Sequence, residues 1–118
     1  QKIEAENGCV QMILFSGKAV GPIFNGEIMP GGVDTQQYGA DDSMTLSARY
    51  MINGTDNQGH TCNLFIENNG SGKVGEELIT YPKIFTDSSA LKYLELAKLT
   101  GQITNEDEQL IIKIFQDE

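Results

Sequence analysis

Gly26-Glu27-Ile28-Met29-Pro30-Gly31-Gly32-Val33-Asp34 is the stretch from which the fold is predicted. We expect one short strand, Phe24 to Met29, to end at this corner and a second, Val33 to Tyr38, to begin after it. Proline fixes one backbone angle and glycine accepts positive φ, so Pro30-Gly31-Gly32 encodes a sharp change of direction. The reversal is therefore predicted from local sequence.

The clearest strand pattern lies downstream of this corner. Met44 to Asn53 alternates apolar and polar residues, which places Leu46 and Ala48 on one face and Arg49 on the other. Thr61 to Asn68 repeats the alternation and is expected to return as its hairpin partner. The other expected strands are Cys9 to Val20, buried on both faces in its middle, Leu78 to Phe85, Leu96 to Thr104 and Glu108 to Gln116.

Turn and helix signals separate these strands. Asn69 to Glu77 is glycine-rich and predicts a flexible loop, and Asn105-Glu106-Asp107 predicts the last hairpin turn. Asp87-Ser88-Ser89 is a helix N-cap cluster, so one short helix is expected near Ser88 to Leu94. Pro82 fits its strand only at an edge or a bulge.

The predicted fold is all-β, an antiparallel β-barrel in a single domain over residues 1–118, with residues 1–8 as a flexible lead-in. A chain of 118 residues suits one domain. Many short strands without βαβ alternation or heptads are typical of a barrel or sandwich, and closure removes free strand edges. We therefore expect a closed or nearly closed barrel.

Charge and composition limit the partners. The chain has 8 basic and 17 acidic residues, a formal charge of −9. Nucleic acid and anionic membranes would be repelled and are not expected as partners. No apolar run reaches the roughly 20 residues that a membrane helix needs. Cytoplasm is the default location, and a removed leader is left open because the chain begins at Gln1.

Cofactor and metal motifs are weak, and neither kind of group is expected. Cys9 and Cys62 are too few for a disulfide framework or a zinc site and are predicted to be reduced. His60 is the single histidine, in a predicted turn without a nucleophile motif near it. Gly70-Ser71-Gly72-Lys73-Val74-Gly75 has the spacing of a dinucleotide fingerprint, but no helix is predicted after it, so we interpret it as a loop.

A set of polar residues gives the candidate binding site: Glu27, Asp34, Gln36, Arg49, Asn63 and Glu67. The Pro30 bend is expected to bring Asp34 and Gln36 beside Glu27, with Arg49 on a neighbouring strand. One interpretation is a solvated ladder of ion pairs, which contributes little to stability. The other is a barrel mouth where Arg49 and a carboxylate hold a small polar ligand, with tyrosines such as Tyr38 as walls.

An ordered series of short motifs runs through most of the chain: Phe15-x-Gly17, Gly21-Pro22-x-Phe24-x-Gly26-Glu27, Pro30-Gly31-Gly32-Val33-Asp34, Leu46-x-Ala48-Arg49-Tyr50, Thr55-Asp56-x-x-Gly59 and Ile66-x-Asn68-x-Gly70. This series resembles the domain-of-unknown-function family numbered 3237, also called uncharacterised protein family 0311, over about Cys9 to Phe115. The resemblance implies an antiparallel β-barrel and supplies no established activity or cofactor. Many members carry Tyr-x-Trp-Leu where this chain has Leu91-Lys92-Tyr93-Leu94.

Three functional hypotheses follow. The first is a barrel that binds a small polar or anionic metabolite, with Arg49 as the charge anchor, Asp34 and Gln36 as hydrogen-bonding groups, and Glu27 or Glu67 orienting Arg49. The second is a cofactor-free isomerase or cyclase with Asp34 or Glu27 as acid or base, which requires a carboxylate in a partly dry pocket. The third is a ligand-free homodimer that acts as an interaction protein.

Overall fold

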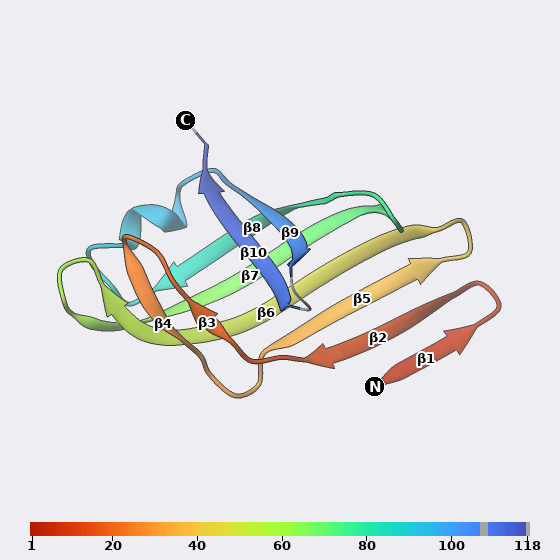
Figure 1. The fold of residues 1–118 in the computed structure, drawn as a ribbon, viewed down its shortest axis with the longest axis horizontal. Coiled ribbons are helices and arrows are strands. Elements are labelled where there is room, and N and C mark those ends of the chain that lie inside the picture. Colours follow the sequence, from red (N-terminus) through yellow and green to blue (C-terminus); the bar gives the residue numbers. More distant parts are fainter. Residues whose placement is uncertain (107–108, 118) are drawn as a thin grey trace.

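The protein is almost entirely β-structure in the computed structural model, which describes residues 1–106 and 109–117 (Figure 1). Its elements, in chain order, are β1 (Lys2–Ala5), β2 (Gly8–Leu14), β3 (Lys18–Ala19), β4 (Phe24–Ile28), β5 (Val33–Gly39), β6 (Ser43–Asp56), β7 (Thr61–Lys73), β8 (Leu78–Thr86), the 3-10 helix η1 (Lys92–Glu95), β9 (Leu99–Glu106) and β10 (Gln109–Gln116). The predicted all-β class is confirmed.

All the strands belong to one antiparallel sheet. Its main order is β1-β2-β5-β6-β7-β8-β9-β10, and β4 joins it through β6 and carries β3 on its other side. β1 and β10 are the ends of this order and do not pair in the described part of the chain, so the expected closure of the barrel was wrong. The sheet curls strongly, and β10 crosses in front of β7 and β6 in Figure 1. The molecule is an open, barrel-like sheet of 51 × 32 × 27 Å.

β6 and β7 form the long central hairpin of the sheet. Their paired residues run without a break from Ser43↔Lys73 to Thr55↔Thr61. On β6 the inner face buries Leu46, Ala48, Tyr50 and Ile52, as the alternation predicted. The loop expected over residues 69–77 was too long, because β7 continues to Lys73. Glycines remain in the strand there because β6 supplies a hydrogen-bonding partner on one side.

The Pro30 corner forms, with one difference from expectation. Gly31 has a φ of 106°, the left-handed region that favours glycine. Gly32 does not share this conformation. A Cβ at Gly32 would lie 3.2 Å from Tyr50 Cβ and 3.3 Å from Ile28 Cγ2. Gly32 is therefore required for close packing rather than for positive φ.

The N-terminal strands differ most from the prediction. Residues 1–8, expected as a flexible lead-in, include β1, which pairs with β2. The strand expected from Cys9 to Val20 ends at Leu14, and most of its side chains are exposed or only partly buried. The reason is topological, since β2 lies next to the end of an open sheet and has no closed barrel wall to cover it.

The core fills one end of the curled sheet. Leu91 is fully buried and Leu94 nearly so, where the η1 segment packs against inner-face residues such as Ile66. The predicted helix is only the short η1, and the backbone N–H of Leu91 donates to Ser88 Oγ at 3.2 Å just before it. Pro82 fits the edge expectation, because β9 pairs with β8 only at Leu78–Thr80. No helix in the described residues is long and apolar enough to cross a bilayer.

Candidate functional site

The register between β5 and β6 decides which polar side chains meet. Asp34 pairs with Ala48, and Val33 pairs with Arg49. Asp34 therefore shares the inner face with buried Ala48, whereas Arg49 points to the outer face. The expectation that Arg49 would lie beside Asp34 and Gln36 was wrong for this reason.

Arg49 belongs to a charged row on the outer face. It pairs in register with Glu67, which pairs with Lys83. Arg49 Nε lies 3.7 Å from Glu67 Oε2, and the Arg49 side chain is 62% exposed. A hydrogen bond from Asn69, together with the charges of Arg49 and Lys83, lowers the pKa of Glu67. This row corresponds to the solvated ion-pair ladder of the sequence analysis, and such pairs contribute little to stability.

Asn63 and Glu27 also lie away from the inner face. Asn63 Nδ2 donates to Asp87 Oδ2 at 2.9 Å, and Asn63 Oδ1 accepts from Asn53 Nδ2 at 2.9 Å. These bonds give Asn63 a structural role between strands. Glu27 is exposed and borders a shallow hollow of about 340 Å³ at the Pro30 corner.

Asp34 and Gln36 do come together, in a hydrogen-bonded row on the inner face that we call the polar row: Gln11, Asp34, Gln36 and Tyr38. Gln36 Nε2 donates to Asp34 Oδ2 at 2.7 Å. Gln36 Oε1 accepts from Tyr38 OH at 2.6 Å and from Gln11 Nε2 at 2.8 Å. Two donors on its carbonyl polarise the Gln36 amide and strengthen the bond it donates to Asp34.

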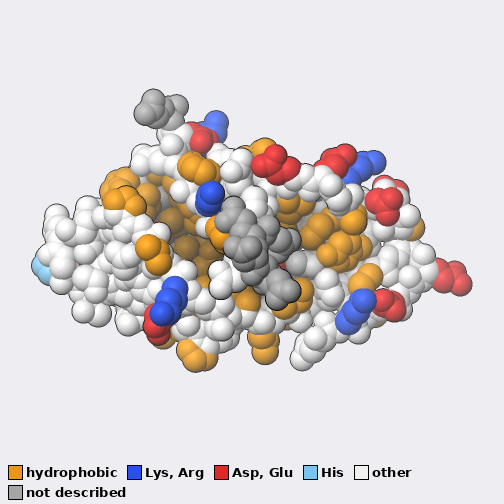
Figure 2. Space-filling view, in the orientation of Figure 1, with side chains coloured by type: hydrophobic (Ala, Val, Ile, Leu, Met, Phe, Trp, Pro, Cys, Tyr) orange, Lys and Arg blue, Asp and Glu red, His pale blue; other side chains and the backbone are white. Residues whose placement is uncertain are grey.

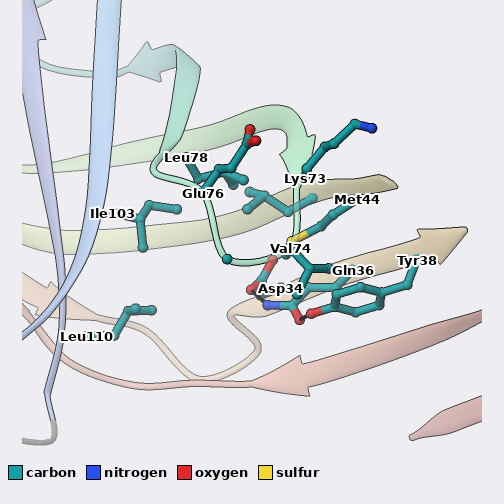
Figure 3. A pocket seen from close by; sticks show the side chains of 12 residues that line it. Asp34, Gln36, Tyr38, Met44, Lys73, Val74, Glu76, Leu78, Ile103 and Leu110 are labelled. Carbon is teal, nitrogen blue, oxygen red and sulfur yellow. Dashed lines mark hydrogen bonds between the residues drawn. The ribbon is translucent and has the colours of Figure 1, made fainter. Parts of the chain in front are cut away.

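Three members of the polar row, Asp34, Gln36 and Tyr38, form one wall of a cavity of about 200 Å³ (Figure 3). Most of the remaining lining is apolar and comes from strands on both sides of the curl: Met44, Leu46, Leu78, Ile103 and Leu110. Figure 3 shows the charged ends of Lys73 and Glu76, at the cavity rim, pointing away from Asp34. The cavity therefore combines an apolar body with one carboxylate wall.

The cavity lies in the half of the curl that the core leaves open. Leu91 and Leu94 fill the other half, near η1. On the face shown in Figure 2, hydrophobic side chains gather in the middle of the molecule and charged ones lie around its margin. This face thus presents apolar surface bordered by charged side chains, and the cavity lining is itself mostly apolar, as is common in small-molecule sites.

One cavity-lining residue, Asp34, has a buried oxygen without a hydrogen-bond partner. Asp34 Oδ1 is enclosed and unpaired, whereas Asp34 Oδ2 is held by Gln36. A carboxylate oxygen accepts hydrogen bonds, so this atom suits a hydroxyl or amine donor. No cluster of three or more His, Cys, Asp or Glu side chains that would hold a metal occurs in the described part of the chain.

Four inner-face residues were not among the binding residues predicted from the sequence: Gln11, Tyr38, Asn68 and Thr80. A signal existed for two of them. Asp34, Gln36 and Tyr38 occupy alternate positions of one strand, so they share a face. Asn68 continues the alternation of the buried residues Leu64 and Ile66, which marks it as a polar residue on an apolar face.

The chain matches a described protein family and a curated relative. The family model described as "Protein of unknown function (DUF3237)" matches residues 4–80. The UPF0311 protein CA_C3321 of Clostridium acetobutylicum is 40% identical over 79 residues, 65% of this chain and 48% of that protein. The chain thus spans about half the length of this relative.

Three solved structures share the fold. A protein with unknown function from Clostridium acetobutylicum superposes with a TM-score of 0.81 at 29% identity, covering 95% of this chain and 83% of that one. The conserved protein of unknown function RPA1785 from Rhodopseudomonas palustris gives 0.77 at 21% identity, covering 98% and 87%. A "beta-barrel like protein" (ABAYE2633) from Acinetobacter baumannii gives 0.75 at 15% identity, covering 95% and 80%. These similarities support the barrel-like fold.

Proposed function

We propose that this chain, which belongs to the DUF3237 family, binds a small, mostly apolar organic molecule with a hydroxyl or amine group that donates a hydrogen bond to Asp34. The single observation that carries the proposal is that Asp34, a residue of the lining of the 200 Å³ cavity, has a buried Oδ1 without a hydrogen-bond partner. An unpaired enclosed acceptor has a free-energy cost that a donor removes. The proposal replaces Arg49 by Asp34 as the anchoring residue.

The size and charge of the cavity narrow the ligand class. An apolar cavity of about 150 Å³ is sufficient for benzene, so 200 Å³ suits a molecule with one ring and one or two substituents. Asp34 would repel a carboxylate or phosphate placed against it, and the chain's charge of −9 adds to that repulsion. A neutral or cationic donor is therefore favoured over the anionic metabolite of the sequence analysis.

The experiment compares two probes of the same shape, 4-methylphenol and 4-methylbenzoate, by isothermal titration calorimetry. 4-Methylphenol is expected to bind and 4-methylbenzoate to bind far more weakly. Asp34→Asn should weaken 4-methylphenol about 10- to 150-fold, because hydrogen bonds to charged groups contribute about 1.5–3 kcal/mol. Arg49→Ala is the control and should bind as the unaltered protein does. Equal binding by Asp34→Asn, or loss in Arg49→Ala, would refute the proposal.

The acid–base enzyme hypothesis places its chemistry at the same atom. The predicted acid or base was Asp34 or Glu27. Glu27 does not line the cavity, so Asp34 is the one that a substrate bound there would contact. A general base needs a free acceptor atom, and Asp34 Oδ1 is a buried acceptor without a partner. Homodimer formation stays a prediction, to be checked by sedimentation over a concentration series.

A further inference from the structure

Two polar side chains on the inner face are fully buried without any hydrogen-bond partner. Asn68 and Thr80 both have 0% exposure. Neither the amide nitrogen nor the amide oxygen of Asn68 is paired, and neither is Thr80 Oγ1. Buried polar groups are nearly always hydrogen-bonded, so three unpaired atoms in two neighbouring side chains need a reason.

These atoms lie where β9 separates from β8. A Cβ built on Gly101 would collide with Thr80 Oγ1 and lie 3.6 Å from Asn68 Oδ1, so both oxygens face the Gly101 backbone. Asn68 pairs in register with Pro82, just beyond the last β8–β9 pair, Thr80↔Gly101. The unpaired groups thus occupy the fork between the two strands.

The fork is also the weakest join within this part of the sheet. β9 pairs with β8 at three positions, Leu78 to Thr80, whereas β7 pairs with β8 from Leu64 to Gly70. Fewer backbone pairs therefore join β9 to β8 than join β8 to β7, although Leu99 of β9 is buried in the core. Separation of β9 from β8 at Thr80↔Gly101 would uncover Asn68 and Thr80, whose side chains have no hydrogen bonds to lose.

The Asp34 cavity adjoins this fork. Asp34 and Asn68 are the two register partners of Ala48 on either side, so their Cα atoms are about 10 Å apart across two strand spacings. Ala48, which lies between them, has a small side chain on the same inner face. Leu78 and Ile103, which pair in register two residues from Thr80↔Gly101, also line the cavity, so the cavity and the fork share strands β8 and β9.

We infer that Asn68 and Thr80 form a second polar subsite beside the Asp34 cavity, reached when β9 separates from β8 at Thr80↔Gly101, for a ligand group that presents a donor and an acceptor side by side. The inference rests on the proposed function of that cavity. A carboxamide has this pattern, because its N–H and C=O match the C=O and N–H of the Asn68 amide. The ligand then carries a donor at one end, for Asp34, and an amide-like group at the other.

The first test uses stability alone and needs no ligand. Thr80→Val keeps the side-chain shape and removes an unpaired hydroxyl, so the protein should become more stable. Thr86→Val is the matched control on the same strand, since Thr86 is 1% exposed but donates to Asn63 O at 2.7 Å. Thr86→Val should destabilise the protein, with the ratio of folded to unfolded molecules reduced about tenfold. A loss of stability in Thr80→Val equal to that in Thr86→Val would overturn the inference.

The second test measures binding with 4-hydroxybenzamide and 4-methylphenol, which differ only in having a carboxamide or a methyl group opposite the hydroxyl. The carboxamide should improve binding about tenfold to the unaltered protein and give no improvement in Asn68→Leu. If 4-methylphenol binds but the carboxamide brings no advantage, the subsite is refuted and the Asp34 cavity stands. If neither probe binds, both the cavity proposal and the subsite are refuted.

Discussion

Replacement of Gly101 by alanine tests whether β9 lies directly against Thr80. The added Cβ would collide with Thr80 Oγ1 and would also contact Pro82 Cγ at 3.5 Å. Gly101 is buried and does not have a positive φ, so the substitution adds a methyl group without backbone strain. The predicted effect therefore comes from packing.

Two opposing contributions set the change in the free energy of unfolding for Gly101→Ala. Overpacking of a buried site costs about 1–3 kcal/mol, whereas the lower entropy of the unfolded chain on Gly→Ala replacement returns about 0.4–1 kcal/mol. The net loss expected for Gly101→Ala is about 1–2 kcal/mol. In a Thr80→Ala background the colliding oxygen is absent, so the same substitution should cost much less, with a coupling of about 1 kcal/mol between the two sites.

Urea unfolding followed by far-ultraviolet circular dichroism measures each variant and the double variant. Gly72→Ala is the control, because a Cβ at Gly72 would meet only the end of the Leu78 side chain, at 3.3 Å. It should be close to neutral. A cost for Gly101→Ala that is the same with threonine or alanine at position 80 would refute the packing of β9 on Thr80.

Two further predictions concern ionisable groups. Burial raises the pKa of Asp56, but hydrogen bonds from His60 N, Ser88 Oγ and Gln58 N outweigh it and hold the pKa below its ordinary value of 3.8. Its stabilising contribution is therefore complete above pH 3.8 and is lost as the pH falls through the lower folded value. The stability gap between the protein and Asp56→Asn should shrink on acidification in urea unfolding, and a gap that is constant from neutral to strongly acidic pH would contradict this. Burial, reinforced by the charge of Asp56, raises the pKa of Cys62, which is 3% exposed. An aromatic disulfide reagent should modify Cys9 in the native protein and Cys62 only after unfolding, and rapid reaction of both thiols in the native protein would show that Cys62 is accessible.

Much of the fold was predictable because it is local. The alternation around Leu46, Ala48 and Tyr50 gave the buried face of β6, and the Pro30 corner gave the turn before β5. The extension of β7 to Lys73 was not predictable from its glycines. It depends on the partner residues that β6 offers from Ser43 onward.

The candidate site was predictable only in part. Asp34 and Gln36 were recognised as polar neighbours on one strand, and the structure places them in one hydrogen-bonded row. Arg49 was assigned to the same group, although it occupies the opposite face of the sheet. The roles of Asn68 and Thr80 needed the structure, because burial without a partner is a property of their surroundings.

The sequence by itself determined which side chains share a face within each strand, since the pleat alternates them whatever the neighbouring strand is. The tertiary structure alone decided which strands' faces meet, and whether the sheet closes. Asp34 lies opposite Ala48 instead of Arg49 because register is set by contacts along the whole length of two strands, and a shift of one residue would exchange the faces. The open curl likewise depends on how β1 and β10, at opposite ends of the chain, lie in space.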